Sequence, residues 1–177
     1  MRFLLALLVL AGCGTRPVEQ SDWERQQGKP APAEAQVELP AYPVAARLVQ
    51  FDRGRASDFR YFVDPATLAV DTDGVVRYVL VARNSGGVEN VTYEGLHCDK
   101  AEFRLYAFGR PDGTWGRSRT GWRPLETAQG RQFALYADYF CPQKVPIRSR
   151  EEGVRALQDD GHPFAKGFGG DHSLRRD

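Results

Sequence analysis

The sequence lacks a surplus of charge of either sign. It carries 24 Lys and Arg residues against 23 Asp and Glu residues, for a formal net charge of +1. Proteins that hold nucleic acid or anionic membrane surfaces by electrostatics need an excess of lysine and arginine. The balanced composition therefore argues against a nucleic-acid partner.

The sequence also lacks a hydrophobic run long enough to cross a membrane. Its most apolar run extends from Phe3 to Leu10, whereas a bilayer core of ~30 Å requires ~20 apolar residues. One basic residue, Arg2, precedes the run and small residues follow it. This order is typical of a secretory signal, and we predict a signal peptide over residues 1–12.

The predicted signal ends in Leu10-Ala11-Gly12-Cys13, which resembles the lipobox of bacterial lipoproteins. The resemblance implies that Cys13 is acylated, with a diacylglycerol on its thiol and an amide-linked chain such as palmitate. Two or more acyl chains give stable membrane anchoring, whereas one gives only marginal binding. Gly14 follows the cysteine in place of an aspartate. In Gram-negative bacteria that pattern implies a place on the periplasmic face of the outer membrane.

Cysteine is scarce, since the chain has only three. If Cys13 is lipidated, Cys98 and Cys141 remain as a pair. Two cysteines in an exported chain predict one disulfide, worth ~4 kcal/mol in the chain-entropy model. The alternative is a free thiol at Cys98 beside His97, which would supply a cysteine–histidine nucleophile.

The remaining sequence divides into a linker, a domain and a tail. Residues 13–38 hold the lipidated cysteine and a segment rich in proline, alanine and glutamine, which predicts an extended, flexible linker. Residues 39–145 are predicted to form the globular domain, and the overall 42% hydrophobic and 27% charged content is ordinary for one. Residues 146–177 predict a solvated helix that starts at a capping box, Ser149 to Glu152, and a flexible tail from His162.

The domain has the pattern of an antiparallel sheet. About five segments are rich in β-branched and aromatic residues or alternate in hydrophobicity: 59–63, 67–70, 75–83, 88–93 and 102–109. Asp64-Pro65 predicts a break between the first two. Segment 75–83 is apolar on both faces at its centre, which indicates an inner strand covered on both sides.

Residues 131–140 favour a helix. One helical stripe is formed by Phe133, Tyr136, Ala137 and Phe140. A strand is the alternative, because Leu135 and Tyr139 are apolar as well. The predicted fold class is therefore α+β, with a small antiparallel sheet of about five strands, one packed C-terminal helix and a single disulfide.

Several short segments in combination resemble a known family. They are Phe62 to Asp64, Asp73 to Tyr78, Asn90 to Gly95 leading to Cys98, Tyr106-Ala107, Trp115, Trp122 and Tyr139 to Cys141. Together with the lipobox they resemble the cryptic neisserial protein 1-like family of proteobacterial envelope lipoproteins. The resemblance covers residues 39 to 141. It implies an envelope location and the extent of the domain, and it implies no biochemical activity.

The densest polar segment surrounds Glu94 and His97. The two side chains would form an acid–base pair if both pointed into one cleft, which would suit an envelope hydrolase. The alternative is structural: Glu94 pairs with Arg77 or Arg104, and a turn at Gly95 positions the disulfide.

Metal and cofactor signals are weak. The segment 71–74, Asp-Thr-Asp-Gly, resembles part of a calcium loop, but Ala69 and Leu80 stand where the loop needs its first ligand and its bidentate glutamate. We expect a turn there. The chain has three histidines, His97, His162 and His172. Two of them lie in the predicted tail, with no carboxylate or thiol at the usual ligand spacing, so we expect no metal and no cofactor.

A non-catalytic binding module is the function that these observations favour. Such a module would be anchored to the membrane by its lipid and would bind an envelope protein or peptidoglycan or another glycan. The candidate binding residues are Arg77, Tyr78, Tyr93, Trp115 and Trp122, provided that they lie exposed together. The hydrolase that uses Glu94 and His97 is the alternative.

Overall fold

The computed structural model describes residues 37–51, 58–125 and 130–165. The predicted signal peptide, Cys13, the linker up to residue 36 and the tail from residue 166 lie outside the described residues. Every element discussed below belongs to the compact unit that begins at Glu38.

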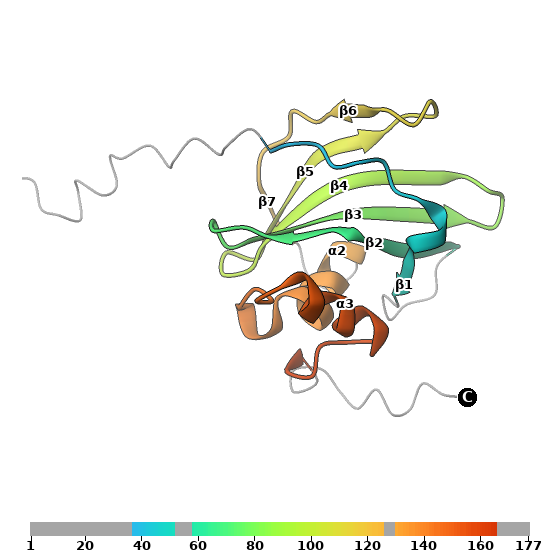
Figure 1. The fold of residues 1–177 in the computed structure, drawn as a ribbon. Coiled ribbons are helices and arrows are strands. Elements are labelled where there is room, and N and C mark those ends of the chain that lie inside the picture. Colours follow the sequence, from blue (N-terminus) through green and yellow to red (C-terminus); the bar gives the residue numbers. More distant parts are fainter. Residues whose placement is uncertain (1–36, 52–57, 126–129, 166–177) are drawn as a thin grey trace, which may run out of the picture. The chain divides into compact units, whose positions relative to one another are not determined.

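The domain is built on a seven-stranded antiparallel sheet (Figure 1). The strands are β1 (Val49–Phe51), β2 (Phe59–Val70), β3 (Val75–Asn84), β4 (Glu89–His97), β5 (Glu102–Gly109), β6 (Trp115–Arg117) and β7 (Arg123–Pro124). Strands β1 to β6 pair in sequence order, and β7 pairs with β5. A 3-10 turn, η1 (Ala45–Arg47), precedes β1. The antiparallel α+β class is confirmed.

The sheet has more strands than the expected five. Asp64-Pro65 does not end a strand, because β2 continues through it with a shift of register between Asp64 and Ala69. Such an irregularity takes Pro65, which has no N–H to donate, out of the regular ladder. Strands β1, β6 and β7 are two or three residues long, too short to produce an alternating pattern.

Strand β3 is the inner strand that its sequence predicts. It lies between β2 and β4, and its first eight residues are all buried. The tight turn that precedes it is also confirmed. The Gly74 N–H donates to the Asp71 carbonyl at 2.9 Å, and Gly74 has a φ of 74°, a conformation that glycine adopts without strain.

The helical segments cover one face of the sheet (Figure 1). They are α2 (Arg131–Ala134), the π-helix η2 (Leu135–Phe140), the 3-10 turn η3 (Pro142–Lys144) and α3 (Arg150–Gln158). The helix expected over residues 131–140 is confirmed in place of a strand. Its second half is wound as a π-helix, in which the Cys141 N–H donates to the carbonyl five residues back. This winding buries Leu135 and Tyr139, which the ideal helical stripe leaves out.

The domain continues past the expected boundary at residue 145. The predicted cap of α3 is present, since the Ser149 hydroxyl accepts from the Glu152 N–H at 3.2 Å. The helix is not simply solvated, because Ala156 and Leu157 belong to the hydrophobic core. A Cβ at Gly153 would lie 2.5 Å from Ile147 Cδ1, so α3 packs closely.

The chain also stays ordered against the domain after α3. His162, where the sequence predicts the start of a flexible tail, is buried, and so is Ala165. The buried imidazole of His162 contacts the Glu152 carboxylate, with 3.1 Å between Nε2 and Oε1. The expectation of a flexible tail from His162 is therefore wrong for residues 162–165.

The expected disulfide between Cys98 and Cys141 is confirmed. It joins the segment after β4 to the end of η2, with the two Cα atoms 5.3 Å apart, and both cysteines are buried in the core. The bridge consumes the thiol of Cys98, so a cysteine–histidine nucleophile at this position is excluded. Among the described residues, no helix is long and apolar enough to span a membrane.

Candidate functional site

Strand β4 separates the two members of the predicted acid–base pair. Its pairing with β3 runs without a shift from Val75 opposite His97 to Arg83 opposite Glu89. Side chains along such a strand alternate between the two faces. Glu94 and His97 are three positions apart, so they point to opposite faces. The structure does not bring them together, and they cannot share a cleft.

Glu94 points toward the helices and is 1% exposed. Its Oε2 accepts from the Tyr78 hydroxyl at 3.2 Å. Its Oε1 accepts from the Thr92 hydroxyl at 2.8 Å and from the Gln132 amide at 3.2 Å. An Arg131 guanidinium nitrogen lies 3.8 Å from the same oxygen. A buried carboxylate is tolerated only when it is bonded in this way; we call this group of five residues the Glu94 cluster.

Tyr78 serves the Glu94 cluster as a hydrogen-bond donor. Burial raises the pKa of its hydroxyl well above the usual value, and the neighbouring Glu94 carboxylate raises it further. The phenol therefore keeps its proton at neutral pH. Tyr78 is fully buried, so it is not the exposed binding residue that the sequence suggested.

Arg77 points to the opposite face of the sheet and does not pair with Glu94 as expected. Its two terminal nitrogens contact Asp71 and Asp73, each at 2.6 Å, and its guanidinium lies over the Tyr106 ring, 5.4 Å from the centroid. We call these four residues the Arg77 cluster. The carboxylates that resembled a calcium loop are used to hold this arginine.

The contact between Arg77 and Asp73 shifts the pKa values of both groups. Burial by itself lowers the pKa of Arg77, but the hydrogen bond to Asp73 and the charge interactions with Tyr106, Asp73 and Asp71 together outweigh it, and the net shift is upward. The same hydrogen bond lowers the pKa of the Asp73 carboxyl. Arg77 and Asp73 are therefore both ionised at neutral pH.

The expected turn at Gly95 is not present, because β4 continues to His97. Gly95 instead makes room for an aromatic ring: a Cβ there would lie 2.7 Å from Cε2 of Tyr106. Arg104, the other expected partner of Glu94, also stacks over Tyr106 at 5.3 Å. It therefore belongs to the face that carries Arg77.

The remaining candidate binding residues pack against or hydrogen-bond to other parts of the domain. Tyr93 is buried with its ring 5.5 Å from Tyr106. The Trp115 indole N–H donates to the Pro40 carbonyl at 2.8 Å, which fastens the segment before η1 to β6. Trp122 meets the His97 ring edge-on at 5.7 Å. The candidates do not form one exposed aromatic patch.

His97 lies beside a carboxylate on the face opposite to Glu94. Its Nδ1 lies beside the Asp99 carboxylate. Over residues 37–51, 58–125 and 130–165, no group of three or more His, Cys, Asp or Glu side chains is placed to hold a metal ion. His172 lies outside these ranges.

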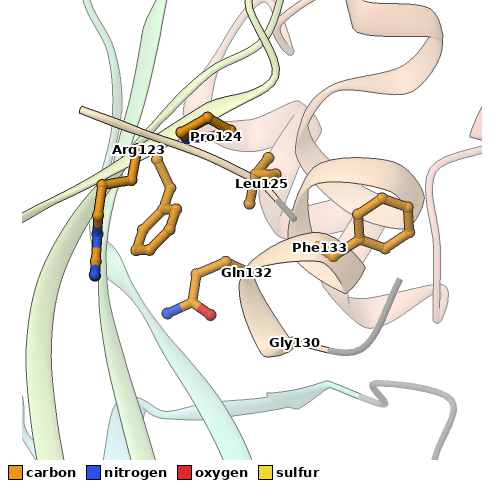
Figure 2. Close-up of a pocket in the computed structure, with 7 residues that line it drawn as sticks. Arg123, Pro124, Leu125, Gly130, Gln132 and Phe133 are labelled. Carbon is orange, nitrogen blue, oxygen red and sulfur yellow. The ribbon is translucent and has the colours of Figure 1, made fainter. Parts of the chain in front are cut away.

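A pocket opens where the helix α2 begins (Figure 2). Its volume is about 350 Å³, and it is lined by Phe103, Arg123, Pro124, Leu125, Gly130, Gln132 and Phe133. We call it the Gln132 pocket. The Arg123 guanidinium lies over the Phe103 ring at 4.8 Å. Gln132 belongs to both the pocket and the Glu94 cluster, so the buried carboxylate stands directly behind this surface.

A second, more apolar cavity of about 580 Å³ lies along the π-helix; we call it the η2 cavity. Its lining includes Tyr136, Ala137 and Lys144. Sequence reasoning singled out neither cavity as a site. The residues of the Gln132 pocket come from β5, from β7 and the residue after it, and from α2 and its N-cap, and no local motif connects them.

Comparison with known proteins identifies the family. The sequence model that describes the CNP1-like family matches residues 27–158 of this chain. The chain belongs to the CNP1-like family. The match extends beyond the expected 39–141 and takes in α3, in keeping with the packing of that helix in the core.

One curated relative of this CNP1-like chain is the cryptic neisserial protein 1 of Neisseria gonorrhoeae. It is 26% identical over 113 residues, which cover 55% of this chain and 56% of the relative. The chain thus spans just over half the length of that protein. No solved structure matches the chain.

Proposed function

We propose that the protein is a lipoprotein of the bacterial cell envelope, anchored in the membrane through Cys13, whose domain is a non-catalytic binding module. The observation that carries the proposal is the bridge between Cys98 and Cys141. Structural disulfides form and persist in oxidising compartments outside the cytoplasm. Of the three cysteines in the sequence, the bridge leaves Cys13, which ends the lipobox-like segment.

The arrangement of polar side chains supports binding rather than catalysis. Glu94 is enclosed by hydrogen-bond donors under the helices, and His97 lies on the other face beside Asp99. Cys98 has no thiol to offer. The Gln132 pocket falls within the usual volume range of ligand sites, roughly 300 to 1,000 Å³. We place the ligand site there, with an envelope protein or a peptidoglycan or glycan component as the partner.

The anchor is tested by replacing the acylated cysteine. Cys13→Ala should abolish incorporation of labelled palmitate and move the protein from the membrane fraction to the soluble periplasmic fraction, because no acyl chain remains. The double variant Cys98→Ser with Cys141→Ser is the matched control and should stay acylated. Unchanged membrane fractionation of Cys13→Ala would overturn the anchor.

Sorting to the outer rather than the inner membrane is tested separately by replacing Gly14, the residue after the cysteine. Gly14→Asp should keep the acyl label and shift the protein from the outer to the inner membrane, since the sorting pattern is changed and the anchor is not. Membrane separation on a density gradient measures this. A variant that stays in the outer membrane would contradict the proposed sorting signal.

A further inference from the structure

We propose that the Gln132 pocket binds a ligand that carries a carboxylate, a neighbouring N–H donor and an apolar side chain. This is the chemistry of the C-terminal residue of a peptide or of an N-acyl amino acid. Glu94 acts in it as a positioning residue. The inference rests on the proposed role of the domain as a binding module.

The first step is the orientation of the Gln132 amide. A carboxylate can only accept a hydrogen bond from an amide, so the NH₂ group of Gln132 faces Glu94, at 3.2 Å. The amide oxygen therefore points away from the core. A Cβ at Gly130 would lie 3.4 Å from this oxygen, and Gly130 lines the pocket. Gln132 thus offers the pocket an acceptor for an N–H.

The second step is the rigidity of Glu94. Its two oxygens accept hydrogen bonds from Tyr78 on the neighbouring strand β3 and from Thr92 on β4 itself. A buried ionic group is often no more stabilising than apolar residues of similar volume. A carboxylate at this place does fix the direction in which Gln132 presents its oxygen, which an apolar side chain would not do.

The third step is the charge and shape of the pocket. The Arg123 guanidinium offers a planar set of donors that suits a carboxylate. Its stacking on Phe103 restricts that plane. In Figure 2 the polar ends of Arg123 and Gln132 both lie below the β7 segment. Leu125 and Phe133 are among the apolar residues that line the pocket. A carboxylate, an N–H and an apolar side chain match these three features.

Titration of the purified full-length protein tests the ligand class. The probes are N-acetyl-leucine and Ala-Ala-Leu, each as the free acid and as the C-terminal amide. Isothermal calorimetry should show binding of the free acids and at least about tenfold weaker binding of the amides, because a hydrogen bond to a charged group is lost. Preference for one free acid over the other identifies the source as peptide or acylated amino acid. Equal affinity for acid and amide, or no binding of any probe, overturns the proposal.

Variants locate the site. Arg123→Gln should weaken binding of the free acids about tenfold or more. Lys144→Gln, in the η2 cavity, is the matched control and should leave binding unchanged. Loss of binding in Lys144→Gln with none in Arg123→Gln overturns the placement. These readouts do not depend on acylation, so a chain that fractionates with membranes and binds no probe refutes this inference and leaves the anchor standing.

The role of Glu94 is tested by exchanging the two residues of its hydrogen bond with Gln132. The double variant Glu94→Gln with Gln132→Glu keeps an amide-to-carboxylate hydrogen bond but turns the carboxylate toward the pocket. Near-ultraviolet circular dichroism should show a folded protein, and the preference for the free acids over the amides should fall, because a second carboxylate then stands beside the one that Arg123 binds. A folded double variant with the full wild-type preference for the free acids contradicts the positioning role.

Discussion

Two buried charges on neighbouring strands are accommodated in opposite ways. Arg77 on β3 is 3% exposed and Glu94 on β4 is 1% exposed, and they face opposite sides of the sheet. The partners of Arg77 are two carboxylates of one turn, whose side chains are 56% and 43% exposed. The hydrogen-bond partners of Glu94 are neutral donors that come from two strands and a helix.

The difference determines what happens when either charge is removed. The carboxylates around Arg77 are open to water and can rehydrate. The strand donors around Glu94, Tyr78 and Thr92, lie beneath the helical layer and would be left without an acceptor. Leaving a buried polar group unsatisfied costs about 1–3 kcal/mol for each group, whereas exposed ion pairs contribute little. Removing the charge of the Arg77 cluster should therefore lower the free energy of unfolding less than removing the charge of the Glu94 cluster.

The largest effect is expected when Glu94 is truncated. Glu94→Ala should lower the free energy of unfolding by about 3–5 kcal/mol, because it leaves Tyr78 and Thr92 without their acceptor and opens a cavity. Urea unfolding followed by tryptophan fluorescence measures the loss. Glu94→Gln, which keeps the volume and an acceptor oxygen, is the control and should lose less. A loss below about 1 kcal/mol for the alanine variant would contradict the proposed importance of the cluster.

A smaller effect is expected at Arg77. Arg77→Met should cost about 2 kcal/mol, since methionine retains much of the packing on Tyr106 while Asp71 and Asp73 return to water. Arg83→Met is the matched control on the same strand. Arg83 pairs with Glu89 at a half-exposed position, so its replacement should cost below about 1 kcal/mol. If Arg77→Met proves as damaging as Glu94→Ala, the contrast between the two clusters is wrong.

The same contrast explains what the sequence could predict. The turn at residues 71–74 and the inner strand that follows it are local, and their residues carry recognisable turn and periodic patterns. The pairing of Cys98 with Cys141 could be predicted because the chain has three cysteines and the lipobox-like segment sets Cys13 apart. The partners of Arg77 lie within six positions of it, although the sequence assigned their carboxylates to a turn alone.

The Glu94 cluster could not be predicted in this way. Gln132 is 38 positions from Glu94, and only the packing of α2 on the sheet brings the two together. The π-helix adds a second obstacle, because its winding moves Leu135 and Tyr139 into the core and defeats an ideal helical periodicity. The faces of β4 were predictable in principle, since a separation of three along a regular strand places Glu94 and His97 on opposite sides.

The smallest expected effect is a loss of folding stability at acid pH. Asp73 has a pKa below its usual 3.8, chiefly through the hydrogen bond from Arg77. A carboxyl whose pKa is depressed by folding stabilises the protein above its unfolded pKa, and that stability is lost as the pH falls through the folded pKa. Because the side chain is 43% exposed, solvent screening limits the contribution to below about 1 kcal/mol.

The Arg77→Met variant isolates this contribution. Glu152 also loses stabilisation in acid, because its pKa is lowered to about 2 by hydrogen bonds from Arg148 and His162 that outweigh its burial. That contribution is present in both proteins and cancels when they are compared. Between pH 6 and pH 3, urea unfolding should therefore show the wild type losing more stability than Arg77→Met. Identical losses in the two proteins would mean that the buried arginine does not stabilise the ionised form of the exposed carboxylates. The Arg77 cluster would then not be a buried charge balanced by exposed carboxylates, and its contrast with the Glu94 cluster would be wrong.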